Sequence, residues 1–191
     1  MSRIELFYAT NRKHEGADRW RPDGYGRKFS DDGMENLRFG RVRVDADDAE
    51  VERCLNRDMG PLGRGDGEAL CKHLTRQAAQ AQVRAYREQI NRKVSDRVQP
   101  NAKLGSAGLF SDLHGLMVDC TDVLVYIHGF NVSWCEAVGS AAALELMLNR
   151  SDARDTGQKV AVVLFTWPSD GLAMPFASYK SDRTEASGSG Y

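Results

Sequence analysis

The sequence predicts an α/β protein with a mostly parallel sheet that opens with antiparallel strands. Residues 123–127 (VLVYI) and 160–165 (VAVVLF) are continuous apolar runs, as expected for parallel strands that are covered on both faces. Residues 133–148 between them predict a helix. Strand, helix and strand in this order form a βαβ unit, whose crossover is right-handed in nearly all known sheets.

The antiparallel opening is predicted by the first residues of the chain. Residues 4–9 form the first strand candidate, and residues 38–45 (RFGRVRVD) alternate with the period of two of a half-solvated strand. The two faces of this second strand are Phe39, Arg41 and Arg43 against Gly40, Val42 and Val44.

A glycine cluster and two helices are predicted between these parts. Residues 60–67 (GPLGRGDG) lack a following Gly-Lys-Ser/Thr, so they predict a flexible connector and not a phosphate loop. Residues 68–98 have apolar side chains three or four positions apart, which predicts one long amphipathic helix that Gln99-Pro100 ends. Residues 107–118 predict a second, shorter helix.

These elements predict one domain, residues 1–191, in four parts. The parts are the opening strands (1–45), the connector and helices (46–120), the βαβ unit (121–171) and a polar tail (172–191).

Composition argues against several classes of protein. The 26 Lys and Arg residues balance the 27 Asp and Glu residues, which gives no electrostatic basis for binding nucleic acid or an anionic membrane. No apolar run approaches the roughly 18 residues that cross a bilayer, and no secretory signal precedes the first strand. We therefore expect a soluble, cytoplasmic protein without a membrane span.

The four cysteines predict neither a metal site nor disulfides. They are far apart and form no Cys-x-x-Cys motif, so they are interpreted as reduced packing residues. We expect no metal and no organic cofactor.

The first parallel strand ends in an unusual turn. In VLVYIHGFNVSW, the strand stops at His128-Gly129, and a helix begins near Ser133, where Ser133 and Glu136 fit a capping box. The helix N-terminus then points above the carboxyl edge of the sheet, and Gly129 lets the backbone approach a ligand. This geometry suits a negatively charged oxygen, although a tight turn with a hydrogen-bonded core histidine explains the same residues.

Three stretches together resemble a known family. VLVYIHGFN, LFTWPSDG further along and LFYATNR near the amino terminus resemble a bacterial family of esterase/lipase-like α/β-hydrolases without an assigned substrate. The resemblance implies an oxyanion turn in which the backbone of Phe130 donates, with Asn131 close by and His128 in a structural role. It also implies that Trp167 and Ser169 line the pocket mouth, although the Pro-Ser-Asp-Gly sequence there is equally ordinary turn chemistry.

The same resemblance implies a nucleophile that the sequence lacks. No serine lies in a Gly-x-Ser-x-Gly elbow, and all four histidines precede the position where the family's catalytic histidine is expected. No catalytic residue is therefore identified. The sequence resembles the oxyanion half of a serine hydrolase for a small ester, thioester or amide, truncated or split before later strands and inactive by itself.

Two other functions fit the same residues. A non-catalytic α/β module could hold an anionic ligand at the Ser133 helix N-terminus, although neither Gly-x-Gly-x-x-Gly nor a Walker A motif is present. An interaction protein could use the apolar strand that begins at Val123 and ends at Ile127 as an unpaired edge, for self-association or for a partner strand.

Overall fold

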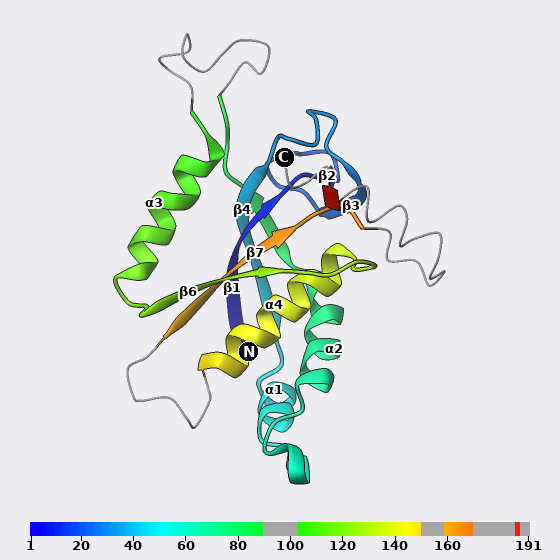
Figure 1. Cartoon of the computed structure of the whole chain (residues 1–191), viewed down its shortest axis with the longest axis vertical. Helices are drawn as coiled ribbons and strands as arrows, with labels where there is room; N and C mark the ends of the chain where they lie inside the picture. The colour runs from blue at the N-terminus through cyan, green and yellow to red at the C-terminus, as the bar shows by residue number, and fades with distance from the viewer. Residues whose placement is uncertain (90–102, 150–158, 170–185, 188–191) are drawn as a thin grey trace.

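A computed structural model of the chain describes residues 1–89, 103–149, 159–169 and 186–187. Five of its strands form one sheet, and the other two pair with each other (Figure 1). The strands are β1 (Ser2–Thr10), β2 (Arg12–Glu15), β3 (Gly24–Phe29), β4 (Arg38–Ala46), β5 (Gln82–Ala85), β6 (Asp122–Ile127) and β7 (Val160–Thr166). The helices are α1 (Asp48–Leu55), α2 (Gly67–Ala78), α3 (Gly105–Met117) and α4 (Trp134–Asn149), with a 3₁₀ turn η1 (Gly60–Leu62).

The main sheet has the strand order β5-β4-β1-β7-β6. β1 and β6 both pair with β7 in parallel, whereas β4 pairs with β1 and with β5 in antiparallel orientation. β1, β5, β6 and β7 therefore run in one direction and β4 runs in the other. The predicted class is confirmed: a mostly parallel α/β sheet with an antiparallel opening.

Two apolar layers cover the two faces of this sheet. Alternate residues of β1 show the division, because Leu6 and Tyr8 join the larger core under α1, α2 and α4, whereas Phe7 joins the smaller core under α3. Figure 1 shows α3 standing apart from α2 and α4. The predicted alternation of β4 is confirmed, since its residues are alternately buried and half-buried along the whole strand.

The predicted βαβ unit is also confirmed. β6, α4 and β7 follow one another, and β6 and β7 are adjacent and parallel. α4 packs closely on α2 where Gly139 meets Thr75, because a Cβ at Gly139 would lie 2.4 Å from Thr75 Oγ1. This contact anchors the crossover helix on the larger core.

The prediction of one long helix over residues 68–98 is wrong in part. α2 ends at Ala78, and Gln82–Ala85 form β5 at one edge of the sheet. Three-residue and four-residue spacing continues through this strand by chance, but Val83 packs beside Val42 in the larger core. Burial of Val83 in the sheet thus overrides the helical pattern. The predicted residues 90–98 lie outside the described residues.

β6 is an edge strand within the described part of the sheet. Its second long side is unpaired there, and Val125 and Ile127 are 57% and 61% exposed. The sequence predicts an unpaired edge here only if the chain is truncated, and truncation stays a prediction. The expectation that both faces of this strand are covered is wrong within the described residues, where most of its side chains are exposed.

Among the described residues, no helix is both long and apolar enough to span a bilayer. The predicted polar tail, residues 172–191, lies almost wholly outside the described residues, and the expected absence of later strands stays a prediction.

Candidate functional site

The carboxyl ends of three neighbouring strands bring the site together. β6 and β7 are in parallel register, so His128 and Trp167 follow strands that end side by side. Thr10, at the end of β1, is paired with Thr166 at the end of β7. Arg12 follows directly. Three segments that are distant in the sequence thus meet at one edge of the sheet, as α/β folds generally arrange their ligand sites.

The centre of the site is Arg12, whose side chain is completely buried. Its Nε donates to Thr166 Oγ1 at 2.9 Å, and its Nη1 donates to the Gly26 carbonyl oxygen at 3.1 Å. Its Nη2 donates to the Val132 carbonyl oxygen at 2.7 Å and lies 3.3 Å from Nε2 of His128. One planar guanidinium therefore contacts β3, the end of β7 and both ends of the turn, which are His128 and Val132.

The neighbours of His128 define its tautomer. Nε2 faces the guanidinium of Arg12 and the backbone N–H of Trp167, each at 3.3 Å, and both groups can only donate. Thr166 Oγ1 lies 2.9 Å from the same nitrogen. We therefore assign Nε2 as the acceptor, so that the proton is on Nδ1 and is donated to the Gly129 carbonyl oxygen at 2.7 Å. His128 is a neutral, buried support of the turn.

Trp167 and Ser169 are buried against the same turn. The Trp167 ring stacks on the His128 ring with centroids 5.1 Å apart, and its Nε1 donates to the His128 carbonyl oxygen at 3.3 Å. Ser169 is completely buried, and its Oγ accepts from the Val132 N–H at 3.0 Å. Both side chains thus form hydrogen bonds with the backbone of the turn and lie on its buried side. Their predicted place at a pocket mouth stays a prediction, because the following residues, from 170 on, lie outside the described residues.

The turn itself faces outward. Phe130 is 55% exposed, and the space beside Gly129 holds no atom within 4 Å of an added Cβ. The left-handed residue of the turn is Asn131, with a φ of 59°, a conformation that asparagine tolerates better than most residues. Gly129 itself has no positive φ, but open space for an approaching ligand is present beside it.

The capping box of α4 is confirmed. Glu136 Oε2 accepts from the Ser133 N–H at 2.8 Å, and the Glu136 N–H donates to Ser133 Oγ at 3.3 Å. The carboxylate of Glu136 thus lies at the positive end of the α4 dipole. This arrangement weakens the case for an external anion at Ser133, because an internal anion already lies there.

An aromatic cluster fixes the start of α4 on the sheet. Trp134 packs edge-to-face on Tyr8 and also contacts Tyr25, and the hydroxyls of the two tyrosines are 2.8 Å apart. Burial raises the pKa of Tyr25 to about 12 and the pKa of Tyr8 well above its ordinary value. These neutral hydroxyls therefore belong to the core and serve as rigid support.

Metal chemistry has no obvious ligand set in the described part of the chain. Within residues 1–89, 103–149, 159–169 and 186–187, no group of three or more His, Cys, Asp or Glu side chains could hold a metal ion. The four cysteines are free, and Cys54 is buried in the larger core.

Two members of the site were not singled out from the sequence. Arg12 and Thr166 both lie in stretches that carried the family resemblance, LFYATNR and LFTWPSDG, but no role was assigned to either residue. The available signal was their position: each is a polar residue at or just after the end of a buried strand that reaches the same edge of the sheet.

Comparisons with known proteins agree with this architecture. A family model described as "Alpha/beta hydrolase of unknown function" (DUF900) matches residues 114–190, which include the turn, α4, β7 and Trp167. Searches of curated proteins and of solved structures found no match. The matched region and the mixed sheet together support an α/β-hydrolase-like fold. The carboxyl-terminal part of the chain is thus similar to an α/β-hydrolase family whose function is unknown.

Proposed function

We propose that this protein contributes the oxyanion-stabilising turn of a serine-type hydrolase that acts on a small ester, thioester or amide. In such a reaction, negative charge develops on the substrate carbonyl oxygen, and backbone N–H groups stabilise it. The proposed donor is the backbone N–H of Phe130, with Asn131 beside it. No metal and no organic cofactor take part in the proposed mechanism.

One observation carries the proposal: an outward-facing backbone turn rests on a rigid, buried hydrogen-bond network. Preorganised donors stabilise a transition state because they do not reorient during the reaction. Arg12, His128 and Ser169 fix both ends of the turn from below, while Phe130 and the open side of Gly129 face outward. The match to an α/β-hydrolase family over residues 114–190 supports the same reading.

The first experiment tests for hydrolase chemistry. The purified chain is incubated with a fluorophosphonate and with p-nitrophenyl esters of increasing acyl length, and adducts are located by mass spectrometry. Because the sequence has no Gly-x-Ser-x-Gly elbow, the longer gene product is assayed in parallel if the gene continues beyond residue 191. A serine adduct together with ester hydrolysis supports the proposal, and the absence of both in every form tested contradicts it.

A second experiment tests the proposed donor itself. Phe130→Pro removes the backbone N–H, whereas Phe130→Ala removes the ring and keeps the N–H. Gly129 precedes this position and tolerates the restriction that proline places on the preceding residue. In the active form, we expect the proline variant to lose about 100- to 1,000-fold in kcat and the alanine variant to lose less than about tenfold. Equal losses in two folded variants would exclude the N–H as the essential group.

A second candidate function is supported by the exposed edge of β6. We propose that two copies pair through this edge, because Val125 and Ile127 are exposed on an apolar strand without a charged side chain between Val123 and Ile127. Light scattering across a concentration series tests this. We expect Val125→Lys to shift the protein to monomer, whereas the control Arg84→Lys, on the opposite edge strand, leaves the distribution unchanged. A monomeric parent protein would contradict the proposal.

A further inference from the structure

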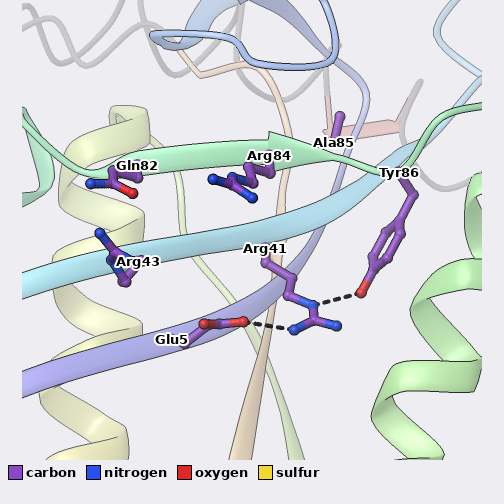
Figure 2. Close-up of a pocket in the computed structure, with 7 residues that line it drawn as sticks. All are labelled: Glu5, Arg41, Arg43, Gln82, Arg84, Ala85 and Tyr86. Atoms are coloured by element: carbon purple, nitrogen blue, oxygen red, sulfur yellow. Dashed lines mark hydrogen bonds and ion pairs between the residues drawn. The ribbon is translucent and has the colours of Figure 1, made fainter.

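A pocket of about 470 Å³ lies on the α3-facing side of β1, β4 and β5, away from the residues of the turn. Figure 2 shows three arginines around it, together with one carboxylate, one amide and one phenol. These lining side chains are Glu5, Arg41, Arg43, Gln82, Arg84 and Tyr86. The three arginines and one glutamate leave two positive charges in this pocket, although the whole chain has a net charge of −1.

Strand register explains why these groups meet. Arg43 lies between Glu5 on β1 and Gln82 on β5, and the next pair along the same face places Arg41 directly opposite Arg84. Like charges directly opposite each other in an antiparallel pair are destabilising. Glu5 and Asp112 offset this repulsion at Arg41, so the register leaves Arg43 and Arg84 as the arginines available to an anion.

Arg41 is already neutralised and fixed in position. Its Nε donates to Tyr86 Oη at 2.8 Å, its Nη1 donates to Glu5 Oε1 at 2.9 Å, and its Nη2 pairs with Asp112 of α3. In Figure 2, Arg41 turns toward Tyr86 and Glu5 and forms one wall of the pocket. The other two arginines of the lining, Arg43 and Arg84, are not held in this way.

Arg43 and Arg84 keep donors for a ligand. The Arg43 side chain is 29% exposed, and its ion pair with Asp45 Oδ2 is long, at 3.7 Å from Nε. Its terminal nitrogens are therefore the donors for a ligand. The Arg84 side chain makes no ion pair or hydrogen bond within the described residues, and it is exposed. Gln82 lies beside them in Figure 2 and adds an amide donor.

We propose that this pocket binds the phosphate group of a small soluble phosphate ester, or inorganic phosphate, through Arg43 and Arg84 with help from Gln82. A phosphate monoester carries a charge of about −1.5 to −2 at neutral pH, which matches the two positive charges of the lining. Guanidinium groups bind phosphate oxygens through paired, charge-assisted hydrogen bonds. The site is separate from the proposed oxyanion turn, and neither proposal depends on the other.

Inorganic phosphate is the probe for the test. Binding is measured by calorimetry and by amide chemical shifts on the unmodified chain, on Arg43→Gln/Arg84→Gln and on Arg27→Gln/Arg76→Gln. The control removes two charges from exposed arginines that do not line the pocket. We expect saturable binding that the pocket variant weakens at least tenfold and the control less than twofold. Absence of saturation at tens of millimolar phosphate, or equal weakening in both variants, would overturn the proposal.

Two further arms define the ligand. Acetate tests whether a monoanion suffices, and glycerol phosphate is compared with vesicles that contain phosphatidic acid. We expect the protein to bind glycerol phosphate and to bind acetate at least tenfold more weakly. We expect its affinity for the vesicles with phosphatidic acid to be no higher than its affinity for uncharged vesicles. Equal affinity for acetate would contradict a site for a dianion, and binding to acidic vesicles without binding to free glycerol phosphate would contradict a site for a soluble ligand.

Discussion

Arg12 and Arg41 show how the same side chain serves two regions of this molecule differently. Arg12 is completely buried beneath the turn, and the partners described above are uncharged: a hydroxyl, two carbonyl oxygens and an imidazole. Arg41 is 39% exposed on the α3-facing side, and two of its three partners are carboxylates. Arg12 holds oxygen atoms of three segments in place, and Arg41 bridges two carboxylates.

The two arginines also differ in the expected cost of their removal, because the partner groups that they leave unpaired differ in exposure to water. Without Arg12, the part-buried carbonyl oxygens at Gly26 and Val132 lose their donor. An acceptor that is left unsatisfied in a buried site costs about 1–3 kcal/mol. Without Arg41, water can solvate Glu5 and Asp112, because both carboxylates are more than one-third exposed. Exposed ion pairs of this kind contribute about 0–1 kcal/mol.

The largest expected effect therefore comes from Arg12→Lys. A lysine keeps the charge but has no planar fork to reach acceptors on three segments, so we expect the free energy of unfolding to fall by about 3 kcal/mol. The matched Arg41→Lys variant should lose less than about 1 kcal/mol. Urea unfolding of both variants measures the difference. Similar losses would show that Arg12 does not organise the turn.

The next effect concerns His128 as the acceptor for two donors. His128→Leu leaves Arg12 Nη2 and the Trp167 N–H facing an apolar group, with an expected loss of about 2–3 kcal/mol. His128→Gln places an amide oxygen near the position of Nε2 and should recover at least half of that loss. Nitrogen-15 NMR of the parent protein should show the proton on Nδ1. A proton on Nε2 would contradict the tautomer and the predicted rescue by glutamine.

Raising the pH should destabilise the aromatic cluster at the start of α4. Tyr25 ionises at about 10 in the unfolded chain and at about 12 in the folded chain, so its contribution is complete below pH 10 and is lost as the pH rises through 12. Over this interval the slope approaches about 1.4 kcal/mol per pH unit for one proton. Tyr25→Phe should flatten the slope measured by unfolding at several pH values. An unchanged slope would assign alkaline unfolding to other groups.

Acid should act on the other region. Hydrogen bonds from Tyr86 and then from Arg41 hold the pKa of Asp112 below its ordinary value of 3.8. Its stabilising contribution is therefore present above that value and is lost as the pH falls through the lower, folded pKa. Asp112→Asn should reduce the acid sensitivity of the free energy of unfolding, measured at several pH values below about 4, and an unchanged acid sensitivity would assign acid unfolding to other groups.

Much of the fold could be predicted from the sequence because local patterns and tertiary packing agree there. The apolar runs of β6 and β7 and the cap at Ser133 are local signals, and each element lies where its pattern indicates. The prediction failed at β5, because a strand of four residues gives too weak a period-two pattern to be told from the helical spacing that precedes it. Burial of Val83 beside Val42 is a long-range effect that no short window of sequence contains.

The site was predictable only in part for the same reason. The turn at His128 has a local signature, so its position could be inferred. Its support by Arg12 and Thr166 could not be inferred, because those residues are separated by 154 positions and meet only through the pairing of β1 with β7. A polar residue that follows a buried strand is the pattern that these two share, and it indicates the edge of the sheet without identifying the partner.

The smallest expected effect, and the sharpest separation of the two regions, comes from salt. At 1 M ionic strength the Debye length is about 3 Å, so exposed charges are largely screened, whereas buried hydrogen bonds are not. The loss caused by Arg41→Lys should therefore shrink by about 0.5 kcal/mol between low and high salt, while the loss caused by Arg12→Lys stays the same. The measurement is urea unfolding of both variants at the two salt concentrations. If the loss caused by Arg12→Lys also shrank in salt, a salt-screened ion pair of the guanidinium would contribute to it, and the hydrogen bonds to Val132 and Gly26 would not by themselves explain the place of Arg12 in the turn.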